Sequence, residues 1–196
     1  MAIRKNHKKR GSALSLTLML IALIGLVVAI VLWPVEAKAS TPAATTAQDD
    51  LVTTTLIHRG DEAPNFSTEM LDGSTVQLKD LRGKPVLLIF WATWCPPCRS
   101  ELAHLQEGVI DVYGDTITVL PISRGEKRDV VEGYISRMGY TFAVGLDSDQ
   151  SIYRKYATNY VPRCFVIDSE GKVLYAGVGY DEEIAKEVDA AIKEAL

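Results

Sequence analysis

The chain has 196 residues, enough for one ordinary domain plus a targeting segment, and 47% of its residues are hydrophobic. Its formal net charge is −4, but the charge is unevenly distributed, because five basic and no acidic residues lie among the first ten. The remainder of the chain contains the other 16 of the 21 Lys and Arg residues and all 25 Asp and Glu residues, so its formal net charge is −9. This acidic body argues against a nucleic-acid partner and favours a solvated surface as the role of the charges.

An uncharged segment rich in Leu, Ile, Val and Ala follows, over residues 12–33. On the order of 20 apolar residues cross a bilayer as a helix, so we expect one transmembrane anchor here, with the basic residues 1–11 in the cytoplasm. The alternative is a cleaved signal peptide with its site at Ala37-Lys38-Ala39, but the apolar run is long for one. Both interpretations put the rest of the chain on the outer, periplasmic or extracytoplasmic, side of the cytoplasmic membrane.

The next segment, residues 34–56, is dominated by Ala, Thr, Ser and Asp without a sustained apolar period. This composition is typical of a flexible tether. We expect a single globular domain over residues 57–196. Its first element is a predicted β-hairpin at residues 66–78, because Asp72-Gly73 is a strong turn signal between two strand-like runs.

The most informative stretch is F-W-A-T-W-C-P-P-C, which ends at Cys98. An apolar run leads into it and an apolar i, i+3, i+4 pattern follows, so the cysteines sit where a buried strand turns into a helix. Cys95 falls near the helix N-cap, Pro96 and Pro97 suit the first helical positions, and Cys98 lies in the first turn within disulfide reach of Cys95. Unpaired N–H groups and the positive dipole end stabilise a thiolate there.

Further elements follow the motif helix, which Gly114 is predicted to end. In order, we expect a strand at 117–122, a helix at 130–138 stopped by Gly139, a strand at 141–146, a helix at 150–157, strands at 163–167 and 172–176, and a helix capped by Asp181. Strands mixed with helices predict an α/β sheet covered on both faces.

The motif W-A-T-W-C-P-P-C resembles the active-site strand–turn–helix of the thioredoxin superfamily. It is most similar to the membrane-tethered branch of TlpA/ResA-like thiol–disulfide oxidoreductases. The order A-P-N-F, hairpin, L-x-G-K, W-C-x-x-C is similar to the start of such a domain, and the resemblance covers about residues 62–196. It implies a thioredoxin-like central sheet flanked by helices, with an N-terminal β-hairpin and an inserted strand–helix, in addition to the transmembrane helix.

The resemblance also implies roles for the two cysteines. Cys95, normally the more exposed cysteine of this motif, is the expected nucleophile, and Cys98 is the resolving thiol that closes the disulfide. A static structural disulfide is disfavoured, because a two-residue spacer closes a tiny loop and gains little stability. Pro96 and Pro97 have no N–H to donate to the Cys95 sulfur, which predicts only a moderate depression of its pKa.

A proton acceptor for Cys98 is also expected. Thioredoxins carry a buried Asp two residues before the first Trp of the motif, and this chain has Ile89 there. Glu101 is the replacement candidate, since it lies one helical turn after Cys98 and the ResA-like branch has a Glu at this position. Partial burial would raise the pKa of Glu101 and let it take the Cys98 proton, whereas the alternative is an exposed helix acid. His104, one turn further, is interpreted as a surface residue.

A client-binding surface is predicted around the cysteines, whereas Trp91 is expected in the core. Val161-Pro162 resembles the family's cis-proline loop, which leaves the Val161 backbone available to pair with an extended peptide. The segment V-P-R-C-F departs from the commoner V-P-T-T-F, and Arg163 introduces a cation that favours a thiolate. Cys164 is expected to be a small buried strand residue, with a regulatory or intermolecular thiol as the alternative. The expected substrate-binding residues are Trp94, Pro96, Pro97, Val161, Pro162 and Arg163.

We therefore expect a monomeric, membrane-anchored thiol–disulfide oxidoreductase that reduces disulfides of exported proteins, with cytochrome c maturation as a candidate pathway and a transmembrane thiol electron donor as partner. The direction of electron flow stays open. No cofactor beyond the Cys95–Cys98 couple and no metal is expected. The alternative is a thioredoxin-fold copper carrier, but three Cys and three His, with His7 before the anchor, leave few ligands. A peroxiredoxin-type peroxidase ranks third, because the P-x-x-x-T/S-x-x-C arrangement is missing.

Overall fold

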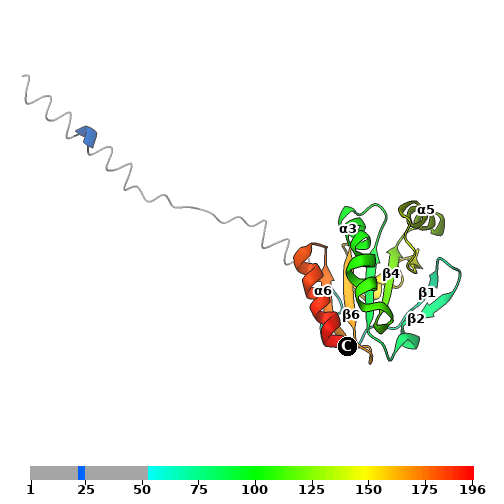
Figure 1. The fold of residues 1–196 in the computed structure, drawn as a ribbon. Coiled ribbons are helices and arrows are strands. Elements are labelled where there is room, and N and C mark those ends of the chain that lie inside the picture. Colours follow the sequence, from blue (N-terminus) through cyan, green and yellow to red (C-terminus); the bar gives the residue numbers. More distant parts are fainter. Residues whose placement is uncertain (1–21, 25–52) are drawn as a thin grey trace, which may run out of the picture. The chain divides into compact units, whose positions relative to one another are not determined.

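The computed structural model of the chain describes residues 22–24 and 53–196 (Figure 1). The chain divides into two units, residues 1–42 and 43–196, and residues 22–24 of the first unit are helical. The predicted anchor and most of the predicted tether lie outside the described residues, so both stay predictions. Within the described ranges, no helix has the length and apolar character needed to cross a membrane.

One sheet organises residues 53–196, and its seven strands follow the order β2-β1-β5-β4-β3-β6-β7. The β3–β4 and β4–β5 pairs are parallel, and the other neighbours are antiparallel. The strands are β1 (Ser67–Met70), β2 (Thr75–Gln77), β3 (Val86–Trp91), β4 (Thr118–Arg124), β5 (Gly145–Asp147), β6 (Arg163–Ile167) and β7 (Val173–Val178). The predicted hairpin is confirmed as β1 and β2, whose turn contains Gly73 at a φ of 85°.

The helices begin and end close to their predicted signals. Within residues 53–196, the α-helices of at least three residues are α3 (Pro96–Leu105), α4 (Asp111–Tyr113), α5 (Arg128–Met138) and α6 (Glu182–Ala195). A π-helical turn (Gln106–Ile110) joins α3 to α4, and short 3₁₀ helices span Leu78–Leu81, Gly114–Thr116 and Tyr153–Lys155. Gly114 and Gly139 end their helices at φ angles of 53° and 70°. The Asp181 carboxylate accepts hydrogen bonds from the backbone N–H groups of Glu183 and Ile184, both at 2.9 Å, so the predicted N-cap of α6 is confirmed.

The helix predicted at 150–157 is wrong. This segment holds only the 3₁₀ turn Tyr153–Lys155, and the strand before it is limited to β5. Gln150 adopts a φ of 62°, which a right-handed helix excludes. The Asp147 carboxylate accepts hydrogen bonds from the N–H groups of Ile152 and Tyr153 at 3.1 and 2.7 Å, so a side chain at the end of β5 holds this segment as a turn.

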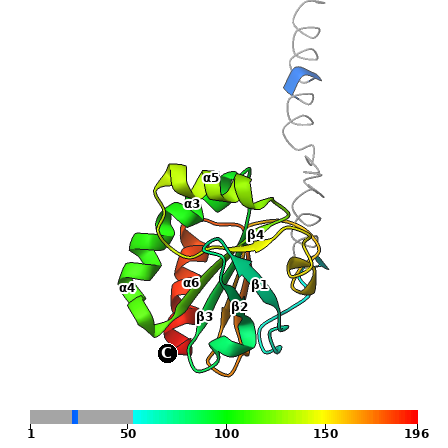
Figure 2. The same cartoon turned by 90° about the vertical axis from the view of Figure 1, so that its right-hand side faces the viewer.

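Alternate side chains of β3 pack into two clusters on opposite faces of the sheet. Leu87, Ile89 and Trp91 belong to the cluster under α3, α5 and α6, and Figures 1 and 2 show these helices on one side of the strands. Leu88 and Phe90 belong to the second cluster, which is rich in aromatic residues from the 150–157 segment and β6. The prediction of a sheet covered on both faces is therefore confirmed, as is the core position of Trp91, which is fully buried.

Candidate active site

The two motif cysteines lie at the junction of β3 and α3 and form a disulfide, with their Cα atoms 5.3 Å apart. Cys95 is the N-cap of α3, and its sulfur accepts a hydrogen bond from the Cys98 N–H at 3.2 Å. Pro96 and Pro97 occupy the first two helical positions, as the motif predicted. The expected difference in exposure is absent in the disulfide form, because Cys95 is 2% exposed and Cys98 is fully buried.

The loop before β6 faces this disulfide. The Val161–Pro162 peptide bond is cis, and the Val161 carbonyl oxygen lies 3.4 Å from the Cys95 sulfur. Trp94, which directly precedes Cys95, is 63% exposed, whereas Pro162 is buried. Three exposed residues therefore surround Cys95, namely Trp94, Pro96 and Pro97. Together with the half-buried Val161, they are the predicted substrate-binding residues that a docked client could contact.

Arg163 was expected to bind substrate, but the structure places its guanidinium elsewhere. Its side chain is fully buried, and by strand alternation it points to the face of Phe165, opposite to α3. The guanidinium donates to the Asn159 carbonyl and to the hydroxyl oxygens of Thr54 and Thr55, over 2.5 to 3.0 Å. A buried group whose donors are held inside the protein does not contact a docked client, so this expectation is corrected.

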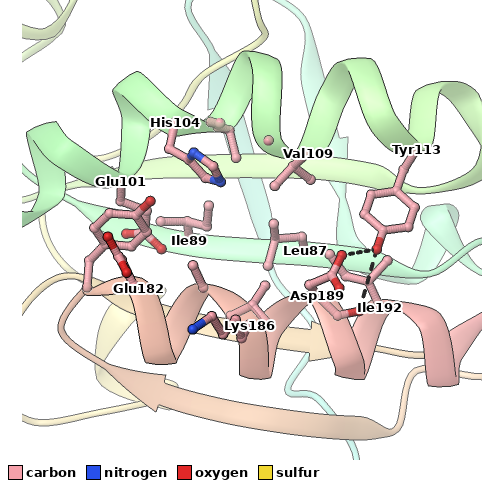
Figure 3. A pocket seen from close by; sticks show the side chains of 15 residues that line it. Leu87, Ile89, Glu101, His104, Val109, Tyr113, Glu182, Lys186, Asp189 and Ile192 are labelled. Atoms are coloured by element: carbon pink, nitrogen blue, oxygen red, sulfur yellow. Dashed lines mark hydrogen bonds between the residues drawn. The ribbon is translucent and has the colours of Figure 1, made fainter.

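Glu101 is buried, 6% exposed, rather than an exposed helix acid. It faces a cavity of about 590 Å³ between α3–α4 and α6, with Leu87 and Ile89 of β3 as its floor (Figure 3). Burial raises the pKa of Glu101 to about 8. Its Oε2 atom has no hydrogen-bond partner among the described residues. A carboxyl group that is neutral near pH 7, and one helical turn from Cys98, can exchange a proton with a thiol.

The open side of this cavity carries charged and polar groups that the sequence did not connect with Glu101. His104 is exposed, as expected, but its ring also lines the cavity. Figure 3 shows His104 on α3 opposite Glu182 and Lys186 on α6. Solvent can therefore reach the cavity from its polar side.

A second buried acid, Glu126, supports the turn that precedes Cys95. Its carboxylate accepts hydrogen bonds from the Thr93 N–H at 2.8 Å, the Thr93 hydroxyl at 2.5 Å and the Ser123 hydroxyl at 3.0 Å. Sequence reasoning missed this residue, since G-E-K-R resembles a solvated loop. The available signal was its place just after β4, because β3 and β4 are parallel and their carboxyl ends meet at one edge of the sheet.

Cys164 is a buried free thiol on β6, paired with Ile89 across the β3–β6 ladder. It belongs to the cluster on the α3 face. Burial raises the pKa of the Cys164 thiol well above its ordinary value. The expected small buried strand residue is what the structure contains at this position. Among the described residues, no three His, Cys, Asp or Glu side chains are grouped to hold a metal ion.

Comparisons with known proteins agree with this geometry. The sequence model of the AhpC/TSA family matches residues 59–176. Thiol-disulfide oxidoreductase ResA of Bacillus thuringiensis is 33% identical over 135 residues, which are 69% of this chain and 77% of that protein. The crystal structure of a thiol:disulfide interchange protein of the thioredoxin family from Chlorobium tepidum superposes with a TM-score of 0.60 at 28% identity, over 70% of this chain and 97% of that one. StoA from Bacillus subtilis, at 23% identity over 66% and 96% of the two chains, shows the same fold with a TM-score of 0.57.

Proposed function

The chain belongs to the AhpC/TSA family of thioredoxin-fold proteins and is a thiol–disulfide oxidoreductase of the ResA type with the redox pair Cys95–Cys98, and we propose that it reduces disulfides in exported proteins. The observation that carries the proposal is the placement of Cys95. Its sulfur lies at the N-terminus of α3, beside an exposed Trp94 and 3.4 Å from the Val161 carbonyl oxygen. An extended peptide that pairs with the Val161 backbone would bring its own sulfur to Cys95.

The proposed reaction is a pair of thiol–disulfide exchanges. In the reduced protein, the Cys95 thiolate attacks one sulfur of the client disulfide, which forms a mixed disulfide and releases the second client sulfur as a thiolate. The ionised form of Glu101, whose share grows as the pH approaches about 8, then takes the proton of the Cys98 thiol, and the Cys98 thiolate attacks the Cys95 sulfur. This step forms the Cys95–Cys98 disulfide and releases the first client sulfur. Two electrons pass to the client, and both client thiolates take up a proton.

The proposed location is the outer side of the cytoplasmic membrane. The basic residues 1–11 and the apolar residues 12–33 support an uncleaved anchor that leaves the catalytic domain outside. No glutathione pool serves thiols there, so a transmembrane thiol donor would return electrons to the Cys95–Cys98 disulfide. The client class we propose is exported proteins with disulfides, with apocytochrome c as one member.

The proposed chemistry is tested with the full-length protein in detergent and a disulfide-bonded peptide client. Cys95→Ser should abolish reduction of the client, whereas Cys98→Ser should accumulate a mixed disulfide that is visible on non-reducing gels. The reduction potential of the Cys95–Cys98 couple, measured against dithiothreitol buffers, should be reducing or intermediate. Full turnover by Cys95→Ser would contradict the assignment of the nucleophile.

The proposed location has its own test. Protease added outside intact cells stripped of their outer layers should digest the domain, while the protein sediments with membranes. Release of a soluble species that begins at Ser40 would instead establish a cleaved signal peptide.

A further inference from the structure

The buried guanidinium of Arg163 joins two segments that are far apart in the sequence. Its Nε and Nη2 atoms donate to the Asn159 carbonyl oxygen at 3.0 and 2.8 Å. Its Nη1 atom donates to the Thr55 hydroxyl at 2.5 Å, and Nη2 also donates to the Thr54 hydroxyl at 2.7 Å. The ion pairs of the described residues do not include Arg163. The buried cation is therefore stabilised by hydrogen bonds to neutral oxygen atoms of residues 54–55 and of Asn159, which replace the water that would surround an exposed guanidinium.

Backbone hydrogen bonds join the same two segments. The Thr158 N–H donates to the Thr54 carbonyl and the Leu56 N–H donates to the Tyr156 carbonyl, both at 2.9 Å. Thr55 and Ala157 form an antiparallel bridge between these bonds. The last residues of the predicted tether thus run alongside the chain that leads into the Asn159–Pro162 loop.

The Asn159–Pro162 loop is strained where these contacts hold it. Tyr160 has a φ of 68°, in the left-handed region that a bulky side chain disfavours. Its carbonyl oxygen accepts a hydrogen bond from the Tyr153 hydroxyl at 2.5 Å. The next residue, Val161, presents the carbonyl that lies 3.4 Å from the Cys95 sulfur. A strained residue keeps its conformation only when its surroundings hold it, so contacts around Asn159 and Tyr160 determine where the Val161 backbone lies.

We propose that Arg163, Thr54 and Thr55 form a clasp that positions the Asn159–Pro162 loop against Cys95, so that the N-terminal segment takes part in client binding. The inference rests on the proposed function, since it concerns the backbone on which a client peptide would dock. Arg163 is a positioning residue, because it acts through the Asn159 carbonyl and touches neither the client nor the disulfide. Arg163 is the residue that follows the loop proline, where V-P-R-C-F departs from V-P-T-T-F.

The test removes the two hydroxyl groups in the full-length protein. Thr54→Val combined with Thr55→Val keeps the side-chain volume. Thr158→Val is the matched control, because Thr158 is exposed and directly follows the Thr55–Ala157 bridge. We expect kcat/KM for a disulfide-bonded peptide to fall about tenfold, mainly through KM, which is the size of effect expected when hydrogen bonds to a charged group are lost. The rate with a small aromatic disulfide should stay within about twofold, because such a substrate reaches Cys95 without the loop. An equal loss with both substrates would overturn the proposal, as would an unchanged kcat/KM for the peptide.

A double-mutant cycle tests whether Arg163 and the threonines act together. If they do, Arg163→Met added to the threonine double variant should cost little more than the larger single effect, whereas multiplied losses would contradict the clasp. Should Arg163→Met fail to fold, the threonine variant decides alone.

Amide hydrogen exchange separates the clasp from the proposed function. Exchange at Tyr160 and Val161 should rise at least about fivefold in the threonine variant and stay at the wild-type rate in Thr158→Val. Unchanged exchange would overturn the clasp whatever the activity. Faster exchange in a protein whose wild type reduces no client would overturn only the proposed function.

Discussion

Glu101 and Arg163 are both buried and ionisable, but they lie on opposite faces of the sheet in opposite circumstances. Glu101 faces a cavity under α3 and α6 and leaves one carboxyl oxygen without a hydrogen bond among the described residues. Arg163 lies in the aromatic cluster on the other face and makes four hydrogen bonds. The difference teaches that burial alone does not indicate a role: a group with free space and a shifted pKa can exchange a proton, whereas a group with all partners in place holds the backbone.

The largest expected effect is on stability and comes from removing the carboxyl group of Glu101. Because burial raises its pKa from 4.5 to about 8, the folded protein keeps a proton that the unfolded chain loses. This contribution to stability is fully present below pH 4.5 and is lost as the pH rises through about 8. Glu101→Gln has no such proton to lose, so its unfolding free energy should gain about 4 kcal/mol on wild type between about pH 4 and pH 8. Parallel denaturant curves for the two proteins over this range would show that the carboxyl group is not buried.

Arg163→Met should have the opposite sign. It removes the four hydrogen bonds that the guanidinium donates to the Asn159 carbonyl and the Thr54 and Thr55 hydroxyls, which should cost about 2 to 3 kcal/mol of unfolding free energy. Since no pKa in the working range is involved, the loss should be the same from about pH 5 to pH 9. Urea titration measures it, with Arg154→Met, an exposed change in the same region, as the control. A loss that varied with pH in this range would break the contrast with Glu101.

The same Glu101→Gln variant should also lose reductase rate, by about tenfold, because it cannot take the Cys98 proton. The pH profile of cysteine alkylation should change as well, since thiol and carboxyl titrate as a coupled pair. Stopped-flow reduction of a disulfide client and iodoacetamide labelling across pH measure the two effects. An unaltered alkylation profile would reduce Glu101 to a structural residue.

Glu126→Gln should have a smaller effect, about 1 to 2 kcal/mol of stability, because one acceptor of the Thr93 hydrogen bonds becomes a donor. The turn that carries Trp94 should loosen, so KM for a protein client should rise while kcat stays close to wild type. Glu132→Gln, an exposed acid on α5, is the control. If only kcat fell, Glu126 would act on the chemistry rather than on the position of the turn.

Cys164→Ala should have the smallest effect, about 1 kcal/mol or less, because it removes one sulfur from a packed strand. Burial raises the pKa of this thiol, so it stays protonated and should not exchange with Cys95 or Cys98. The reduction potential of the active pair should therefore match wild type. A shift in the reduction potential of the Cys95–Cys98 couple would show that Cys164 takes part in the redox chemistry.

Local signals predicted most of the fold. The apolar run of β3, the glycines that end α3–α4 and α5, and the Asp181 cap of α6 each depend on a few neighbouring residues, so the sequence contains them in full. The helix predicted at 150–157 is absent because Gln150 adopts a left-handed conformation, and hydrogen bonds to the Asp147 carboxylate hold the segment as a turn. The spacing of apolar residues, on which the helix prediction was based, indicates neither of these two features.

The sequence by itself determined the chemistry of this protein: two cysteines at a helix N-terminus and a carboxyl group one turn later, because these spacings are set by helix geometry alone. Only the tertiary structure decided the environment of each charge. Glu101 is buried because α3 and α6 lie on the same face of the sheet and enclose the cavity that Glu101 faces. The Arg163 side chain lies on the other face, where it donates to the Thr54 and Thr55 hydroxyls. Glu126 reaches Thr93 because β3 and β4 are parallel neighbours. Burial and pKa depend on contacts between residues distant in the chain, which no local pattern contains.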